Sequence, residues 1–468
     1  MYLNVGVTEM LLTASRHAAI CAAVVGLVVG GAGSRAATPT APSPNAPSYN
    51  GGAQVSLRLV NLVLERQILQ RQTVTDEVAG VRTVAETTTK GKLRAEFIPS
   101  STQAIVDFRL VGDLSAPNAT ATRGSVTVRM ASQTSIDARK RLIVTPNGLF
   151  PGPSEADCNT ETEILDVEAN RRVMERLGRR RAEKLRPEAQ ESANQQVAER
   201  VETELDSQAK DPVAEANKFY AEKLRLPLIN VGGFPRDIRI STSASHVAIR
   251  LLAQQQGQSA PSTRMPVMSA KYDIFVCGHE SLVTNMSEPL VGGKTFDDKQ
   301  FLDVMKIMTG TAQRGLWVYD GRPRWNVTFA KKRPIQATFA NGTFHLTYSF
   351  ESVTCGADTV RAPLEASALY RPEITRDGVR LVRQSSPTIA FTDSMPDDDA
   401  RTRVREQMTE RFNAFFQSDL YFDGLSPPEG GTWAKLRELR LTELRCEDGW
   451  FTIGYMLNEP GKLAAQTK

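Results

Sequence analysis

Long stretches in which apolar and polar residues alternate are the feature that most constrains this fold. One such stretch runs from Val126 to Leu142, and shorter ones run from Leu93 to Phe97 and from Ala104 to Leu110. Successive side chains of a β-strand point to opposite faces, so alternation of this kind indicates a strand with one buried face. The sequence therefore predicts antiparallel strands, some of them unusually long.

A second β-rich part is expected from residue 228 to the C-terminus at residue 468. Asn341-Gly342 separates two alternating runs and is typical of a type I′ hairpin turn, and Asp448-Gly449 repeats this signal. Apolar residues at helical spacing also predict an amphipathic helix near the C-terminal end, at Val404, Met408, Phe412, Phe415 and Phe416.

Between the two β-rich parts, residues 160–227 consist largely of helix-forming residues. The segment Arg171–Arg186 is strongly basic, whereas Glu188–Asp206 is mostly acidic. Two helices packed antiparallel around Pro187, or one bent helix lying against the sheet, both fit this pattern. The predicted fold class is α+β: mostly antiparallel β-sheet in two β-rich parts, residues 54–150 and 228–468, separated by a charged helical segment.

The N-terminus has the layout of a secretory signal peptide over residues 1–36. Arg16 and His17 precede an apolar run, Ala18–Gly31, and Ser34-Arg35-Ala36 supplies a small-x-small cleavage pattern. The run is short for a transmembrane helix, so no span is expected after cleavage. Residues 37–53 are rich in Pro, Ser, Ala and Gly and predict a disordered linker. We therefore expect an exported protein, secreted or periplasmic.

Charge gives little indication of a partner. The formal net charge is +4 over 468 residues, which provides no case for nucleic-acid binding. The basic block contains Arg179, Arg180 and Arg181, and these are the candidates for contact with an anionic partner. A solvated helix face, partly neutralised by the acidic block that follows, is the favoured interpretation.

Four cysteines remain after removal of the signal peptide: Cys158, Cys277, Cys355 and Cys446. An even number in an exported chain permits two disulfides, with three possible connectivities. Buried free thiols are the alternative, and the sequence leaves both open.

Motifs for catalysis or metal binding are weak. His279 and Glu280 are the only catalytic candidates, with Ser281 beside them. A zinc-protease motif is excluded because Val283 stands where its second histidine would be. Structural roles are favoured for the scattered histidines, and neither a metal site nor a cofactor is predicted.

The order of parts resembles a group of uncharacterised exported bacterial proteins. The similarity rests on four segments: TTTKGKLRAEFIPS at Thr87–Ser100, DARKRL at Asp137–Leu142, HESLVTNMSEPLVGGKTFDD at His279–Asp298 and RWNVTFAKKRPIQATF at Arg324–Phe339. These motifs are structural, and the resemblance implies no activity. In architecture alone, long strands flanked by helices are similar to tubular lipid-binding proteins, which is an analogy of fold.

The leading hypothesis is an exported, non-enzymatic protein of the cell envelope with a binding or structural role. Its expected partners are a lipid or other apolar ligand and envelope components, because long half-apolar strands favour an elongated apolar molecule. Two alternatives stay open. One is a secreted hydrolase that uses His279 and Glu280 on an envelope or extracellular polymer, and the other is a partner-binding module that uses the charged helices.

Overall fold

The computed structural model describes residues 49–458, except residues 65, 79–80, 125, 170–171, 302–323, 376–377, 397, 424–435 and 437–438. The predicted signal peptide and residues 37–48 of the predicted linker lie outside this part. Residues 51–53, also predicted as linker, instead belong to strand β1 (Gly51–Ser56), every residue of which is buried. The linker prediction is therefore wrong at its C-terminal end.

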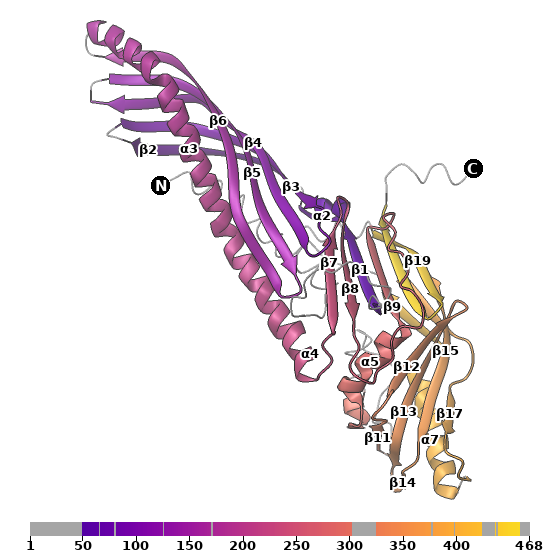
Figure 1. Cartoon of the computed structure of the whole chain (residues 1–468). Helices are drawn as coiled ribbons and strands as arrows, with labels where there is room; N and C mark the ends of the chain where they lie inside the picture. The colour runs from indigo at the N-terminus through magenta and orange to yellow at the C-terminus, as the bar shows by residue number, and fades with distance from the viewer. Residues whose placement is uncertain are drawn as a thin grey trace, which may run out of the picture. The chain divides into compact units, whose positions relative to one another are not determined.

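The protein is β-rich, with three antiparallel sheets, as the alternating pattern predicts. It forms two compact units (Figure 1). In the described part, the first unit comprises residues 57–221 and 240–247, and the second comprises residues 49–56, 222–239 and 248–458. Both units draw on separate stretches of the chain, so their boundaries do not follow the sequence divisions at residues 150, 160 and 228.

The first unit is built around a five-stranded sheet of consecutive strands, in the order β2-β3-β4-β5-β6. The strands are β2 (Arg66–Val78), β3 (Val81–Ile98), β4 (Ala104–Arg123), β5 (Val126–Thr145) and β6 (Gly148–Ala169). Strands β4 and β5 are each 20 residues long and β6 has 22, which confirms the prediction of long strands. Strand β6 ends at Ala169, so the helical segment begins later than residue 160.

Helix α2 (Leu57–Leu64) packs on strand β3 of this sheet. The amide of Asn61 accepts a hydrogen bond from the Ala95 backbone N–H (2.7 Å) and donates one to the Ala95 carbonyl (3.0 Å). The β2–β3 register starts at Arg66 and Leu93, so no residue of β2 pairs with Ala95. The side chain of Asn61 thus takes the place of a strand neighbour there.

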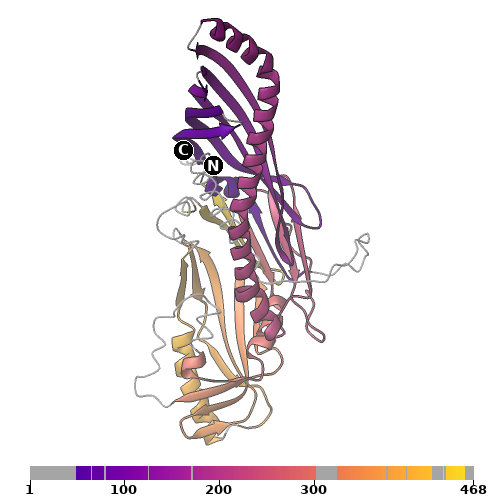
Figure 2. The ribbon, with the colours of Figure 1, turned by 90° about the vertical axis from the view of Figure 1, so that its left-hand side faces the viewer.

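Residues 172–219 form one continuous helix, α3 (Arg172–Phe219), with Pro187 and Pro212 inside it. It is followed by a π-helical turn, η1 (Tyr220–Arg225), and by the short helix α4 (Leu226–Asn230). The single-helix alternative is therefore correct for this segment. Figures 1 and 2 show α3 running along the five-stranded sheet, where it contacts β6 most and β5 less.

Helix α3 supplies hydrogen-bond acceptors to the free edge of β6, whose other edge pairs with β5. Four of its side chains accept hydrogen bonds from backbone N–H groups of β6: Asn194 from Thr160 (2.7 Å), Glu202 from Ala156 (2.9 Å), Asp206 from Ser154 (3.1 Å) and Asn217 from Leu149 (2.8 Å). Their spacings of eight, four and eleven residues place these four within an arc of about 140° on one side of the helix. An exposed strand edge is prone to aggregation, and the helix covers it.

The second sheet has six strands in the order β19-β20-β9-β1-β8-β7. Its strands, besides β1, are β7 (Asp237–Thr242), β8 (His246–Leu252), β9 (Ile274–His279), β19 (Leu439–Glu447) and β20 (Trp450–Leu457). The β19–β20 turn holds Asp448 at φ 52° and Gly449 at φ 78°, as expected of the Asp-Gly signal. Helix α5 (Glu280–Val291) follows β9 directly.

The third sheet has nine strands, and its core is aromatic. Its strands are β10 (Thr295–Asp297), β11 (Trp325–Phe329), β12 (Ile335–Ala340), β13 (Thr343–Cys355), β14 (Asp358–Val360), β15 (Leu364–Ile374), β16 (Gly378–Arg383), β17 (Thr388–Phe391) and β18 (Asp419–Asp423). Helix α7 (Asp399–Phe415) buries Val404, Met408, Phe412 and Phe415 against it, as predicted. Large side chains of sheet and helix thus fill this face.

Candidate functional site

A ligand-sized pocket of about 570 Å³ lies on one face of the six-stranded sheet, within the second unit. Its floor comes from strands β19, β20 and β9, on which Arg445 pairs with Thr452 and Thr452 with Cys277. The lining residues are Thr263, Arg264, Pro266, Val267, Ser269, Lys271, Tyr272, Phe275, Glu443, Arg445, Glu447, Asp448, Trp450 and Thr452.

One wall is a loop that precedes β9, residues 262–272, which we call the pocket loop. Hydrogen bonds fasten it to the sheet at both ends. Thr263 donates to the Asp448 carbonyl (2.6 Å) and accepts from the Trp450 indole N–H (2.9 Å). At the other end, Gln54 of β1 donates to the Ser269 carbonyl (2.6 Å). The sheet therefore determines the position of this wall of the pocket.

Glycine in β20 allows an aromatic ring to lie against the strand. A Cβ atom added at Gly454 would stand 2.6 Å from Cε1 of Tyr272, so only glycine leaves room for this ring. Tyr272 stacks on Phe275 with 5.5 Å between ring centroids, and its hydroxyl donates to the Glu443 carboxylate. Tyr272, Phe275 and Trp450 are all buried. The aromatic side of the pocket is thus rigidly held.

The pocket also carries charged side chains beside Tyr272. Two cations share the Glu443 carboxylate, because Lys271 Nζ and Arg445 Nε each lie 3.4 Å from it. Lys271 also lies 4.4 Å from the centre of the Tyr272 ring, within cation–π range. Arg264, from the pocket loop, has no hydrogen-bond or ion-pair partner among the residues that the structure describes. Glu447 and Asp448 place negative charge near the β19–β20 turn.

The hydroxyl of Thr452 is the one polar group in the pocket floor that stands out. The residue is 6% exposed, and its Oγ1 has no hydrogen-bond partner in the described part of the chain. A buried hydroxyl without a partner costs free energy, so such groups are uncommon in folded proteins. Thr452 lines the pocket through its other atoms, because its Oγ1 is closed to solvent.

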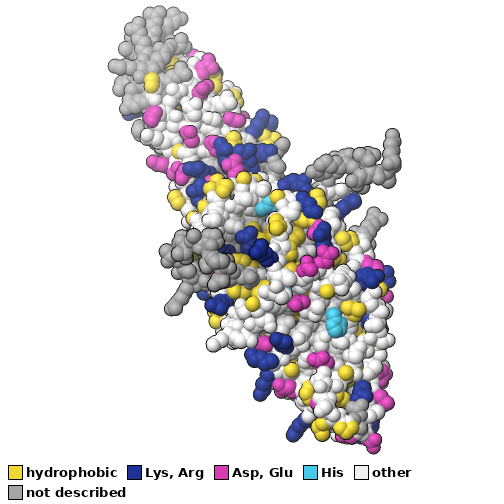
Figure 3. All heavy atoms as spheres, turned by 45° about the vertical axis from the view of Figure 1, so that its right-hand side comes forward, with side chains coloured by type: hydrophobic (Ala, Val, Ile, Leu, Met, Phe, Trp, Pro, Cys, Tyr) yellow, Lys and Arg dark blue, Asp and Glu magenta, His cyan; other side chains and the backbone are white. Residues whose placement is uncertain are grey.

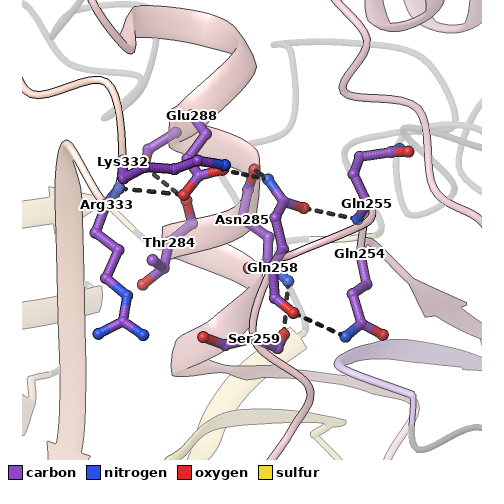
Figure 4. A network of polar contacts seen from close by, with 10 residues as sticks. Gln254, Gln255, Gln258, Ser259, Thr284, Asn285, Glu288, Lys332 and Arg333 are labelled. Carbon is purple, nitrogen blue, oxygen red and sulfur yellow. Dashed lines mark hydrogen bonds and ion pairs between the residues drawn. The ribbon is translucent and has the colours of Figure 1, made fainter.

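A polar network holds the chain just before the pocket loop against helix α5 (Figure 4). Gln258 donates to the Asn285 carbonyl (2.9 Å) and to the Glu288 carboxylate (3.0 Å), which also accepts from the Arg333 backbone N–H (3.1 Å). Burial alone would raise the pKa of Glu288, but these bonds and Lys332 lower the pKa overall. The ionised carboxylate thus fixes the segment that leads into the loop.

The catalytic candidates His279 and Glu280 lie at the start of helix α5 and do not line the pocket. His279 is 1% exposed, and its ring caps the helix by accepting a hydrogen bond from the Ser281 backbone N–H (3.0 Å). Burial lowers the pKa of His279 and raises the pKa of Glu280. Their geometry is that of a buried helix terminus, with Trp450 packed edge-on against the His279 ring.

The four cysteines are free and buried, which corresponds to the free-thiol alternative. Each belongs to a different strand: Cys158 to β6, Cys277 to β9, Cys355 to β13 and Cys446 to β19. Burial raises the pKa of both Cys277 and Cys446 to about 12, which keeps these thiols protonated at neutral pH.

The candidates for an anionic partner, Arg179, Arg180 and Arg181, lie on helix α3, and their side chains lie outside the described part. Side chains of both signs are interspersed on the face drawn in Figure 3. Within the described ranges, no group of three or more His, Cys, Asp and Glu side chains is arranged to hold a metal. None of the described helices is both long and apolar enough to cross a membrane.

The sequence did not single out the residues that form the pocket. The loop residues Arg264 and Lys271 belong to no recognisable motif, and the alternation of Trp450, Thr452 and Gly454 indicates only an ordinary strand. The glycine in that alternation was the available signal, because glycine inside a strand marks a close approach by another group.

Comparisons with known proteins give no family. No family model matches the sequence, and no curated protein sequence matches it. Among solved structures, a crystal structure of lipopolysaccharide binding protein aligns at 10% identity and a TM-score of 0.30, covering 88% of this chain and 100% of that one. The P47 protein from Clostridium botulinum A2 aligns at 9% identity and a TM-score of 0.23, covering 87% and 97%. Scores this low establish no shared fold.

Proposed function

We propose that this chain is an exported, non-enzymatic binding protein of the cell envelope, and that its ligand is partly apolar and occupies the pocket of the second unit. The observation that carries the proposal is the pocket itself. Its volume falls in the range of small-molecule sites, and it combines an aromatic side with a few fixed polar groups.

Two observations support binding over catalysis. Of the catalytic candidates, His279 caps helix α5 and Glu280 lies in its first turn, and both are outside the pocket lining. The pocket lining contains no histidine or cysteine, and its most buried carboxylate, Glu443, is engaged with Tyr272, Lys271 and Arg445. General acid–base catalysis needs a group free to exchange a proton with substrate.

The pocket is preferred to the nine-stranded sheet as the ligand site. Phe301, Phe329, Phe350 and Phe412 are each no more than 2% exposed in the aromatic core of that sheet, so its inner face is filled by the protein. Export is proposed from the sequence of residues 1–36 alone, with its basic start, apolar run and small-x-small site.

Native mass spectrometry of the protein purified without detergent tests the proposal. We expect a bound organic molecule that extraction with organic solvent releases. Val267 is 89% exposed in the pocket wall, so Val267→Glu leaves folding unaffected and should abolish the adduct. The matched control is Met395→Glu, at a residue that is 66% exposed and outside the pocket. Retention of the same adduct by Val267→Glu would place the ligand elsewhere and overturn the proposal.

A further inference from the structure

We propose that the ligand of this pocket is an amphipathic anion: a molecule with one carboxylate or phosphate group on an apolar body. The inference rests on the proposed function and adds the chemical class of the ligand and the residues that recognise it. Arg264 and Arg445 bind the anionic group. The aromatic side of the pocket and the exposed side chain of Val267 contact the apolar body.

The first step is the position of the two arginines in the pocket. Arg445 pairs directly with Thr452 across strands β19 and β20, so its side chain stands on the pocket floor. Oγ1 of Thr452 is closed to solvent, so the guanidinium of Arg445 is the donor that an acidic group reaches there. Arg264 supplies a second guanidinium from the pocket loop.

The second step is the availability of the positive charge. Glu443 is the only carboxylate within 4 Å of Arg445 in the described part, and it also accepts the Tyr272 hydroxyl and pairs with Lys271. One carboxylate thus serves two cations at this point, and Glu447 and Asp448 are the other carboxylates that line the pocket. Arg264 has no partner among the described residues. Guanidinium groups bind carboxylate and phosphate through paired hydrogen bonds, which are stronger than neutral ones.

The third step is the location of the apolar part of the ligand within the pocket. Tyr272, Phe275 and Trp450 form one buried cluster, against which Met265, Met268 and Met456 pack. The negative charges of Glu447 and Asp448 lie beyond Arg445, toward the β19–β20 turn, and disfavour a second anionic group at that end. A single charged head with an apolar tail therefore fits better than a polyanion.

Isothermal titration calorimetry on the full exported chain, after removal of co-purified lipid, tests the inference. The probes share one tail: dodecanoate, dodecyl phosphate, dodecanol and dodecylphosphocholine. We expect at least one of the two anions to bind about tenfold more tightly than dodecanol, as one charge-assisted contact requires. The two anions also separate a carboxylate source from a phosphate source. Arg264→Gln and Arg445→Gln should each weaken anion binding about tenfold and leave dodecanol unchanged.

Arg440→Gln is the matched control, because Arg440 is exposed on the same strand β19 and lies outside the pocket. Equal affinity for dodecanol and both anions would overturn the anionic head while leaving a binding pocket in place. Tightest binding of dodecylphosphocholine would replace the anion with a zwitterion, and Glu447 or Asp448 would then hold its cationic group. Absence of binding by every probe, with no adduct in native mass spectrometry, would instead overturn the proposed function.

Discussion

Replacing Thr452 with valine should stabilise the free protein, although most substitutions of buried residues destabilise. Threonine and valine have nearly the same shape, so Thr452→Val exchanges a hydroxyl for a methyl group and leaves the packing intact. The hydroxyl is buried, at 6% exposure, and unpartnered in the described part of the chain. A buried polar group without a hydrogen bond costs about 1–3 kcal/mol, and the substitution removes this cost.

The expected gain is about 1–2 kcal/mol in the free energy of unfolding, after allowance for partial relaxation of the site. For a unit of this size, that corresponds to a rise in Tm of roughly 2–8 °C. The same variant should leave binding of dodecanoate unchanged, because Oγ1 of Thr452 is closed to solvent. Differential scanning calorimetry and titration calorimetry on the same lipid-free sample measure both effects.

Thr242→Val is the matched control, because Thr242 is also a strand residue with 6% exposure. Its hydroxyl accepts a hydrogen bond from the Ile105 N–H (2.9 Å) and donates to the Gln103 carbonyl (3.2 Å). This control should therefore lower stability by about 1–3 kcal/mol. A loss of more than about 1 kcal/mol for Thr452→Val would refute the reasoning, since it would show that the Thr452 hydroxyl already has a partner in the free protein.

Four further predictions address the rest of the fold. Asp206→Ala should lower the free energy of unfolding by about 1–3 kcal/mol, because it removes the carboxylate that pairs with the buried Lys140 and accepts a hydrogen bond from Ser154. Glu199→Ala, at an exposed residue of the same helix, is the control, and calorimetry compares the two variants. Phe412→Ala should cost about 3–5 kcal/mol through a cavity in the aromatic core, measured by denaturant unfolding. Burial lowers the pKa of His279, so the folded protein favours the neutral ring, and stability should fall as the pH drops below 6.5 toward the lowered value. The variant His279→Asn keeps a capping acceptor and should reduce this pH dependence, which Tm measured from pH 7 to pH 5 would show. N-terminal sequencing of the exported protein should find Ala37 as the first residue, and an intact N-terminus would contradict cleavage.

The elements that sequence predicts well are those with a local signal. Alternation from Val126 to Leu142 identifies β5 because the side-chain period of a strand is visible in any short window. Asn341-Gly342 identifies the β12–β13 turn because both residues adopt positive φ, at 52° and 71°. Helix α7 begins after Asp398, whose side chain accepts from the Arg401 N–H (2.7 Å) as an N-cap does.

Features that depend on distant parts of the chain were not predictable. Pro187 signals a break, yet α3 continues through it, because the helix is held along β6 by Asn194, Glu202, Asp206 and Asn217 rather than by its own propensity. Composition cannot tell paired from free cysteines, since pairing requires close Cα atoms.

The pocket was missed for the same reason. Thr452 becomes distinctive only once the pocket loop lies over β20 and leaves its hydroxyl without a partner. Arg264 and Arg445 are separated by 181 positions in the sequence, and only the fold brings both to one pocket. In contrast, His279 and Glu280 drew attention as adjacent polar residues, a pattern that a helix cap also produces.

Photo-crosslinking tests the central claim most directly, because it reports where an apolar ligand sits. A dodecanoate carrying a diazirine in its tail is bound to the full chain, irradiated, and mapped by peptide mass spectrometry. The account predicts adducts on the pocket loop, residues 262–272, and on β19 and β20, which unlabelled dodecanoate suppresses. Adducts confined to the five-stranded sheet of the first unit would contradict it and move the binding site to strands β2 to β6.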